Sequence, residues 1–152
     1  MAQPTTRPDT TLRITRTFAA PRERVFQAWT DPAALKEWWG PPGYATPVAE
    51  VDLRVGGRYR IGMTEQPDGQ VIYLTGVFRE VRPPEKLVYT WHWESDATQS
   101  ETLVTVEFRD QGASTEVALL HEMFPTAQER DAHERGWTGA LDKLVGFFAG
   151  RM

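Results

Sequence analysis

The sequence contains no cysteine, which excludes disulfide bonds, thiol nucleophiles and thiolate metal sites. It has no excess of positive charge either: Lys and Arg total 17 against 21 Asp and Glu, giving a net charge of -4. A negative chain lacks the attraction to phosphate on which nucleic-acid and anionic-membrane binding depend. No apolar run approaches the roughly 20 residues that span a bilayer, and Met1–Thr10 has no apolar signal-peptide core. We therefore expect a cytoplasmic protein with no nucleic-acid partner and no membrane insertion.

Histidines are scarce as well, and the chain holds only His92, His121 and His133. Because no closely spaced pair of ligands accompanies them, they predict no metal site. Gly56-Gly57 lies between two strand patterns with no helix start after it, so it predicts a turn rather than a phosphate-binding loop. The acidic residues of the predicted strands fall where solvent exposure is the default, and no serine stands in a nucleophile–base pattern. The sequence therefore assigns neither a cofactor nor a catalytic residue.

Aromatic residues, in contrast, are plentiful: the 152 residues include six tryptophans, seven phenylalanines and four tyrosines. So many rings predict either a bulky interior or an interior with a hole lined by rings. The length suits one domain with one core, and 40% hydrophobic with 25% charged residues is ordinary for a globular protein. We expect a disordered tail over residues 1–10 and a single domain over residues 11–152.

The pattern from Thr126 to Gly150 predicts one long helix. Thr126 stands three residues before Glu129, which is the spacing of a capping box, and Gly150 follows the last apolar residue. Residues of one face recur at steps of three and four: His133, Trp137, Ala140, Leu141, Leu144, Phe147 and Phe148. Gly136 and Gly139 lie beside this face, and each costs roughly 1 kcal/mol relative to alanine, so they predict the close approach of another backbone. So broad an aromatic face needs a large apolar partner.

The rest of the chain predicts a sheet that supplies this partner. Alternating apolar residues predict strands at Thr11–Phe18, Thr46–Leu53, Arg58–Glu65, Gln70–Val81, Leu87–Trp93, Thr102–Phe108 and Thr115–His121. Two short helices follow the first strand, one opening at Pro21 and one capped by Asp31 before Pro32. Pro67-Asp68-Gly69 is a strong hairpin signal, and hairpins imply an antiparallel sheet. We expect an α+β fold in which a curved seven-stranded antiparallel sheet wraps around the terminal helix.

Several motifs, in a fixed order, resemble those of a known family. They are Thr15-Arg16, Ala20-Pro21-Arg22-Glu23-Arg24-Val25-Phe26, Ala28-Trp29-Thr30-Asp31-Pro32, Trp38-Trp39-Gly40-Pro41, Gly56-Gly57-Arg58-Tyr59, Gly76, Pro83-Pro84-Glu85-Lys86-Leu87, and Gly136-Trp137 with Leu141 and Leu144. From about Thr11 to Phe148 the chain resembles the domain homologous to the C-terminal part of the activator of heat-shock protein 90 ATPase, within the START-like, birch-pollen-allergen-like (SRPBCC) superfamily. The resemblance implies a helix-grip fold with a cavity between sheet and helix. It implies no single function, since relatives bind lipids or aromatic metabolites, catalyse cyclisation or dehydration, or assist a chaperone.

The cavity implied by the resemblance would lie between the inner faces of the sheet and the helix. The residues expected to bind a ligand there are Trp38, Met63, Tyr73, Tyr89, Trp91, His121, His133, Trp137, Leu141 and Phe148. His121 is in phase with the apolar residues of its strand, and His133 lies one helical turn before Trp137. These two histidines either satisfy the core or orient a ligand in an apolar pocket.

Two further features have two interpretations each. Trp38-Trp39 either forms a lid over a ligand or, in the plainer interpretation, places one ring in the core and the other on the surface. Arg16 shares a face with apolar residues of the first strand. It either pairs with a carboxylate near the surface, which is the plainer interpretation, or anchors an acidic group of a ligand.

The leading functional hypothesis is a small-molecule binding protein. Its internal hydrophobic cavity, of roughly 300 Å³ or more, would hold a lipid-like or aromatic ligand. One alternative is an enzyme, a cyclase, dehydratase or hydrolase acting on a hydrophobic substrate, which needs a convergent acid–base pair facing the cavity. The other alternative is a co-chaperone-like protein-interaction module. A chaperone partner is not expected, because the chain leaves no room for the additional N-terminal domain of the eukaryotic activator.

Overall fold

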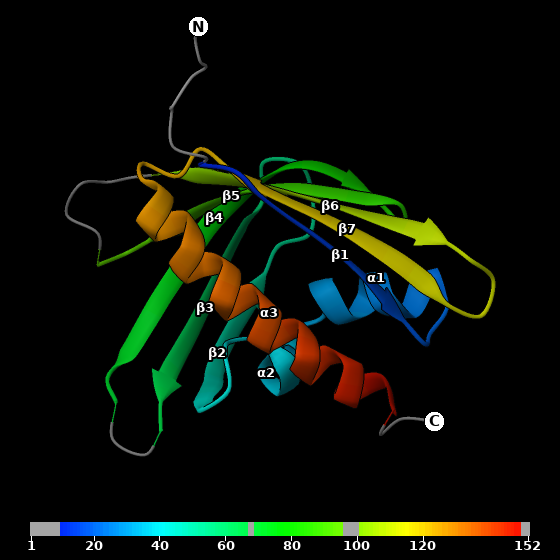
Figure 1. The fold of residues 1–152 in the computed structure, drawn as a ribbon, viewed down its shortest axis with the longest axis horizontal. Helices are drawn as coiled ribbons and strands as arrows, with labels where there is room; N and C mark the ends of the chain where they lie inside the picture. The colour runs from blue at the N-terminus through cyan, green and yellow to red at the C-terminus, as the bar shows by residue number, and fades with distance from the viewer. Residues whose placement is uncertain (1–9, 67–68, 96–100, 150–152) are drawn as a thin grey trace, which may run out of the picture.

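The computed structural model describes residues 10–66, 69–95 and 101–149. The elements are β1 (Leu12–Phe18), α1 (Arg22–Thr30), α2 (Pro32–Trp38), β2 (Tyr44–Val51), β3 (Arg58–Glu65), β4 (Val71–Arg82), β5 (Lys86–Trp93), β6 (Thr102–Asp110), β7 (Thr115–Glu122) and α3 (Ala127–Ala149) (Figure 1). Three expectations fall outside the described residues: the disordered tail up to residue 9, the turn at Pro67-Asp68 and the helix end at Gly150.

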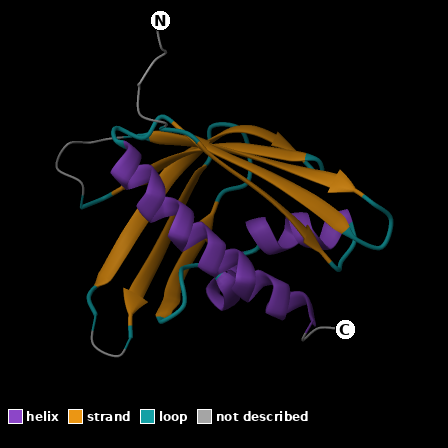
Figure 2. Ribbon diagram, viewed as in Figure 1, coloured by secondary structure: helices purple, strands orange, loops and turns teal. Residues whose placement is uncertain are grey.

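The seven strands form one antiparallel sheet in the order β1-β7-β6-β5-β4-β3-β2. The sheet arches, and α3 runs diagonally across its concave side (Figures 1 and 2). The two short helices α1 and α2 lie on the same side, near the C-terminal half of α3. This arrangement confirms the predicted helix-grip fold, because a sheet with one apolar face buries that face against the apolar face of a helix.

The predicted element boundaries hold to within about two residues. The largest difference is in β2, which begins at Tyr44 and ends at Val51 rather than spanning Thr46 to Leu53. Pairing between β2 and β3 continues past an irregularity between Ala45 and Val48. The strand extends across this irregularity because proline, which stands at position 47 and lacks an N–H, is tolerated where the ladder is interrupted.

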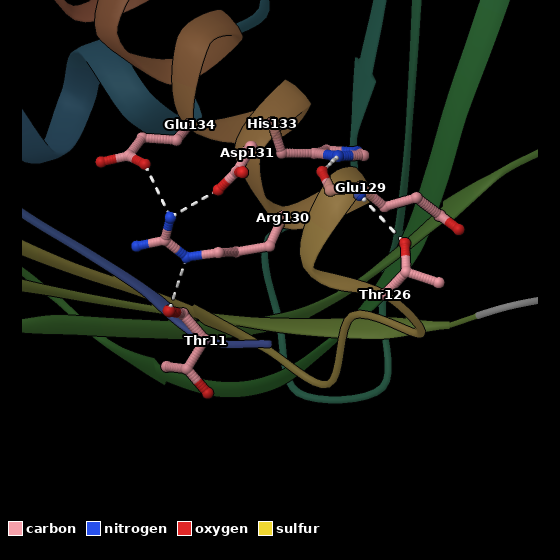
Figure 3. A network of polar contacts seen from close by, with 7 residues as sticks. All are labelled: Thr11, Thr126, Glu129, Arg130, Asp131, His133 and Glu134. Carbon is pink, nitrogen blue, oxygen red and sulfur yellow. Dashed lines mark hydrogen bonds and ion pairs between the residues drawn. The ribbon is translucent and has the colours of Figure 1, made fainter. Parts of the chain in front are cut away.

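The helix starts follow from capping chemistry. The Asp31 side chain accepts a hydrogen bond from the backbone N–H of Ala33, and Pro32 opens α2. Thr126 precedes α3, and its Oγ1 accepts from the backbone N–H of Glu129 at 3.1 Å (Figure 3). The predicted cap of the long helix is therefore present in the structure.

Both rings of the Trp38-Trp39 pair are buried, with exposed fractions of 0% and 5%. The expectation that one ring rests on the surface is therefore wrong. Trp38 tolerates complete burial because its Nε1 donates to the carbonyl oxygen of Ala28 at 2.8 Å. Trp39 packs edge-on against both Trp38 and Trp137, so it forms part of the contact between α2 and α3.

The two glycines beside the inner face of α3 have different surroundings. A Cβ on Gly139 would lie 2.4 Å from Cδ of Pro42, so the loop after α2 approaches the helix closely there, as predicted. A Cβ on Gly136 would meet nothing within 4 Å, so the same prediction is wrong for this residue. Arg16, on β1, forms an ion pair with Asp142 of α3, which confirms the plainer interpretation of that arginine. Within the described ranges, no helix combines the length and apolar character needed to cross a bilayer.

Candidate functional site

A cavity of about 300 Å³ lies between the N-terminal half of α3, the strands β3 to β5 and the loop after α2. Its volume matches the predicted lower limit for a ligand site. The lining residues are Trp39, Gly40, Pro41, Tyr44, Met63, Ile72, Trp91, Trp93, Ala132, His133, Gly136, Trp137 and Ala140. None of these lining residues is acidic, lysine or arginine, so the described wall of the cavity is apolar with a few polar atoms.

Four of the ten residues expected to bind a ligand line this cavity: Met63, Trp91, His133 and Trp137. The other six lie elsewhere: Trp38, Tyr73, Tyr89, His121, Leu141 and Phe148. Trp38 and Leu141 are fully buried in the core, and Phe148 packs against Phe18 at the other end of α3. Tyr73 is half-buried, and its ring lies under the guanidinium of Arg60.

The remaining two predicted residues lie behind the cavity wall. Tyr89 is buried beside Tyr59, and its hydroxyl accepts a hydrogen bond from Nε1 of Trp29 at 3.2 Å. His121 is fully buried, with its ring centroid 4.8 Å from that of Trp91. His121 therefore supports the lining residue Trp91 without reaching the cavity itself, whereas Tyr89 packs with residues that do not line the cavity.

Sequence reasoning missed several lining residues for which a signal existed. Ile72 alternates in β4 with the buried Leu74 and Phe78, so strand parity assigns it, and not Tyr73, to the inner face. Trp93 alternates with Trp91 in the same way. The residues of the loop after α2, Gly40 and Pro41, carry no periodic signal, because the path of a loop depends on tertiary packing.

His121 holds a buried chain of hydrogen bonds behind the cavity. The indole Nε1 of Trp137 donates to Nδ1 of His121 at 3.0 Å. An indole nitrogen only donates, so Nδ1 is the acceptor and the proton of the neutral ring sits on Nε2. Nε2 lies 2.7 Å from Oγ1 of Thr102, whose hydroxyl donates onward to the carbonyl oxygen of Trp91 at 3.4 Å. This chain connects α3, β7, β6 and β5.

His133 is held in the same manner at the cavity wall. The indole Nε1 of Trp93 donates to its Nε2 at 3.0 Å, so Nδ1 carries the proton and donates to the carbonyl oxygen of Glu129 at 2.8 Å (Figure 3). The first turns of α3 that position His133 are tied to the sheet by Arg130. Its Nε donates to the carbonyl oxygen of Thr11, just before β1 (Figure 3).

Both imidazoles are neutral in the folded protein. Burial lowers the pKa of His121 from 6.5 to about 2, and the neighbouring His133 adds to the shift. Burial also lowers the pKa of His133, although the hydrogen bond to the carbonyl of Glu129 opposes the effect. Both ring nitrogens of His121 and both of His133 form hydrogen bonds, and the described wall contains no carboxylate. The described residues of the cavity wall therefore provide no free acid–base pair.

Comparison with known proteins places the chain in a family. The profile of the family described as "Activator of Hsp90 ATPase homolog 1-like protein" matches residues 19–149. No protein with a curated description matches the chain at a significant level.

Solved structures are similar over nearly the whole chain. A protein from Chromobacterium violaceum is 29% identical, with a TM-score of 0.82, and the match covers 91% of this chain and 97% of that protein's chain. The AHSA1 protein from Silicibacter pomeroyi is 30% identical, with a TM-score of 0.81, covering 93% and 99%. An HSP90 activator from Plasmodium falciparum is 30% identical, with a TM-score of 0.61, covering 77% and 75%. With the helix-grip fold and the profile match over most of its length, the chain belongs to the family of Activator of Hsp90 ATPase homolog 1-like proteins.

Proposed function

We propose that the protein binds a small apolar ligand bearing an aromatic ring in the cavity beside α3. The observation that carries this proposal is the wall itself, which combines four tryptophans with no charged side chain among the described lining residues. Ligand sites are typically concave, mostly apolar and equipped with a few polar groups. At about 300 Å³ the cavity suits a molecule of two or three fused or linked rings better than a two-chain lipid.

The arrangement of the rings supports an aromatic ligand in particular. Trp91 contacts Trp39, Trp93 and Trp137, with ring centroids 5.4 to 5.8 Å apart. Such rings present both edges and faces to the space between them, and aromatic pairs gain about 0.5–1.5 kcal/mol beyond their buried area. A flat ligand ring gains the same contacts from several sides.

A cavity-filling substitution tests the proposal. Gly136 lines the cavity and a Cβ there meets nothing within 4 Å, so Gly136→Leu places a side chain where the ligand would lie. Gly146→Leu is the matched control, because Gly146 is in the same helix, has equally open space at its Cβ and does not line the cavity.

The probe is N-phenyl-1-naphthylamine, an uncharged dye whose emission rises in apolar surroundings. We expect saturable binding to the wild type and to Gly146→Leu, and at least tenfold weaker binding to Gly136→Leu. Equal binding by all three proteins would place the dye outside the cavity and reject the proposal.

The second candidate function is activation of heat-shock protein 90, favoured by the 30% identity to the Plasmodium falciparum HSP90 activator. It is tested by adding the purified protein to the chaperone from its own organism and measuring ATP hydrolysis. We expect no stimulation. A concentration-dependent, several-fold stimulation that Gly136→Leu leaves unchanged would show that a surface, and not the cavity, carries the function.

A further inference from the structure

Lys143 of α3 contacts the chain at the point where it leaves α2. Its Nζ donates hydrogen bonds to the carbonyl oxygens of Trp39 at 3.3 Å and of Gly40 at 3.1 Å. Trp39 caps the C-terminus of α2, where the last carbonyl groups of a helix have no partner within the helix. A lysine beside such a terminus satisfies these groups and is attracted by their partial negative charge. Lys143 therefore joins the end of α2 to α3.

Both carbonyl groups belong to residues that line the cavity. Trp39, Gly40 and Pro41 form the part of the lining that follows α2, called here the loop wall. Lys143 is not among the described lining residues, but it lies about one helical turn beyond Ala140, which is. Its hydrogen bonds thus connect two parts of the lining, the loop wall and α3.

The loop wall is held from the sheet and from the helix by different contacts. On the sheet side, Oγ1 of Thr46 in β2 donates to the same carbonyl oxygen of Trp39 at 2.9 Å. On the helix side, Pro42, the residue after the loop wall, lies close to Gly139 of α3. This second contact is apolar packing, so Lys143 supplies the hydrogen bonds that fix the direction of the chain on the side of α3.

The position of Lys143 carries a cost. Its side chain is half-buried, and burial lowers the pKa of its ammonium group below the ordinary value. No carboxylate of the described residues forms an ion pair with it, and the adjacent Asp142 pairs with Arg16. A charge that is removed from water needs hydrogen-bond partners. The two carbonyl oxygens of the loop wall are the partners that compensate the burial of Lys143.

We propose that Lys143 is a positioning residue of the ligand site, whose two hydrogen bonds hold the loop wall against α3 and keep the Trp39 ring in contact with the ligand. The role rests on the proposed function, because it names a residue that controls the affinity of the same cavity without touching its occupant. Without the ammonium group the loop wall moves more freely. The ligand then loses part of its contact with Trp39 and dissociates sooner.

Lys143→Met tests this role, because methionine keeps an unbranched apolar stem and removes the ammonium group. The probe is again N-phenyl-1-naphthylamine, and both its affinity and its dissociation rate are measured. We expect roughly two- to tenfold weaker binding, the range in which residues outside a site affect binding to it. Most of the change should come from faster dissociation.

Two control variants separate positioning from loss of charge and from loss of stability. Lys36→Met makes the same change of charge at an exposed position of α2. Thr115→Val removes a buried hydrogen bond, from Oγ1 of Thr115 to the carbonyl oxygen of Ala20 at 2.8 Å, beyond the lining of the cavity. Both should bind the dye like the wild type, although Thr115→Val should unfold at lower urea concentration. Weakening of binding by Thr115→Val as large as that by Lys143→Met would reject the proposal.

Hydrogen exchange provides a readout that needs no ligand. The backbone N–H of Tyr44 donates to the carbonyl oxygen of Pro41 in the loop wall at 3.1 Å. Loop amides exchange through local opening, so a loss of global stability alone leaves their rate unchanged. We therefore expect Lys143→Met, and not Thr115→Val, to speed the exchange of this amide.

The outcomes distinguish this inference from the proposed function. If the wild type binds the dye and Gly136→Leu blocks binding, but Lys143→Met changes neither affinity nor the exchange of the Tyr44 amide, the role of Lys143 is rejected and the proposed function stands. If the wild type does not bind the dye, both are rejected.

Discussion

Nε1 of Trp137 lies 3.0 Å from Nδ1 of His121, and this one contact joins the middle of α3 to β7, the last strand in the sequence. Both residues are buried, at 4% and 0% exposure, so water does not replace either partner. The contact also fixes the tautomer of His121 and thereby orients the bond to Thr102. The interface between the sheet and α3 therefore contains a hydrogen bond at this point, with apolar packing around it.

Trp137→Phe is expected to destabilise the protein through this contact. The substitution leaves Nδ1 of His121 buried without a donor, at a cost of about 1–3 kcal/mol in the free energy of unfolding, beyond the loss of ring area. Trp93→Phe is the comparison, because its partner His133 is only half-buried and water has access to the freed acceptor. Urea unfolding measures both. A larger loss for Trp93→Phe than for Trp137→Phe would contradict the ranking.

The stability of the fold is expected to fall as the pH drops below 6.5. The pKa of His121 is 6.5 when unfolded and about 2 when folded, so between these values the unfolded chain binds a proton that the folded protein does not. His121 thus favours the folded state fully above pH 6.5, and this contribution is lost on acidification. The slope is about 1.4 kcal/mol per pH unit well below 6.5, and His133 acts in the same direction.

The measurement is the free energy of unfolding at several pH values between 7.5 and 4.5, for the wild type and His121→Phe. The variant should be less stable at neutral pH and should lose less stability on acidification. Parallel curves for the wild type and His121→Phe would rule out His121 as the source.

The fold was predictable because its signals are local and repeated. Alternation along seven strands and a three-to-four period over α3 set the elements, and each boundary error was small. Pairing a sheet with one apolar face to a helix with a broad apolar face leaves few arrangements. The cap at Thr126 was predictable from the sequence for the same reason, since capping depends on residues three positions apart.

The candidate site was only partly predictable. Lining residues on the inner face of regular elements, such as Met63 and Trp137, are predictable from the alternation of a strand or the period of a helix. Periodicity does not separate residues that line a cavity from residues that fill the core, so Leu141 was assigned to the site although it lies in the core. That difference depends on how α3 is placed along the sheet, which is a property of the whole structure.

The three interior glycines of α3 are expected to respond differently to alanine. Gly136→Ala and Gly146→Ala should each raise the free energy of unfolding by about 1 kcal/mol, because alanine is the better helix former and its Cβ meets nothing within 4 Å. Gly139→Ala should lower it, because its Cβ would lie 2.4 Å from the Pro42 ring. Thermal melting of the three variants tests this. Stabilisation by Gly139→Ala would show that the loop after α2 moves away freely.

Trp39 lines two spaces, and replacing it with a smaller residue is expected to change which ligands fit. It lines the main cavity and also a void of about 20 Å³, whose other lining residues include Tyr59, Ile61, Phe78 and Tyr89. Trp39→Leu removes the ring that lines both spaces, and we expect the two spaces to join. We therefore expect affinity to shift toward a longer apolar probe, 1,6-diphenylhexatriene, relative to N-phenyl-1-naphthylamine.

Trp38→Leu is the matched control for this prediction, because Trp38 is an equally large buried ring beside Trp39 that lines neither space. Both variants should lose stability, by less than the roughly 3–5 kcal/mol typical of a buried tryptophan replaced by alanine. Only Trp39→Leu should alter the ratio of the two probe affinities, since only it is expected to join the spaces. An equal change of that ratio in both variants would mean that general loosening of the core, and not the joining of the two spaces, admits the longer probe.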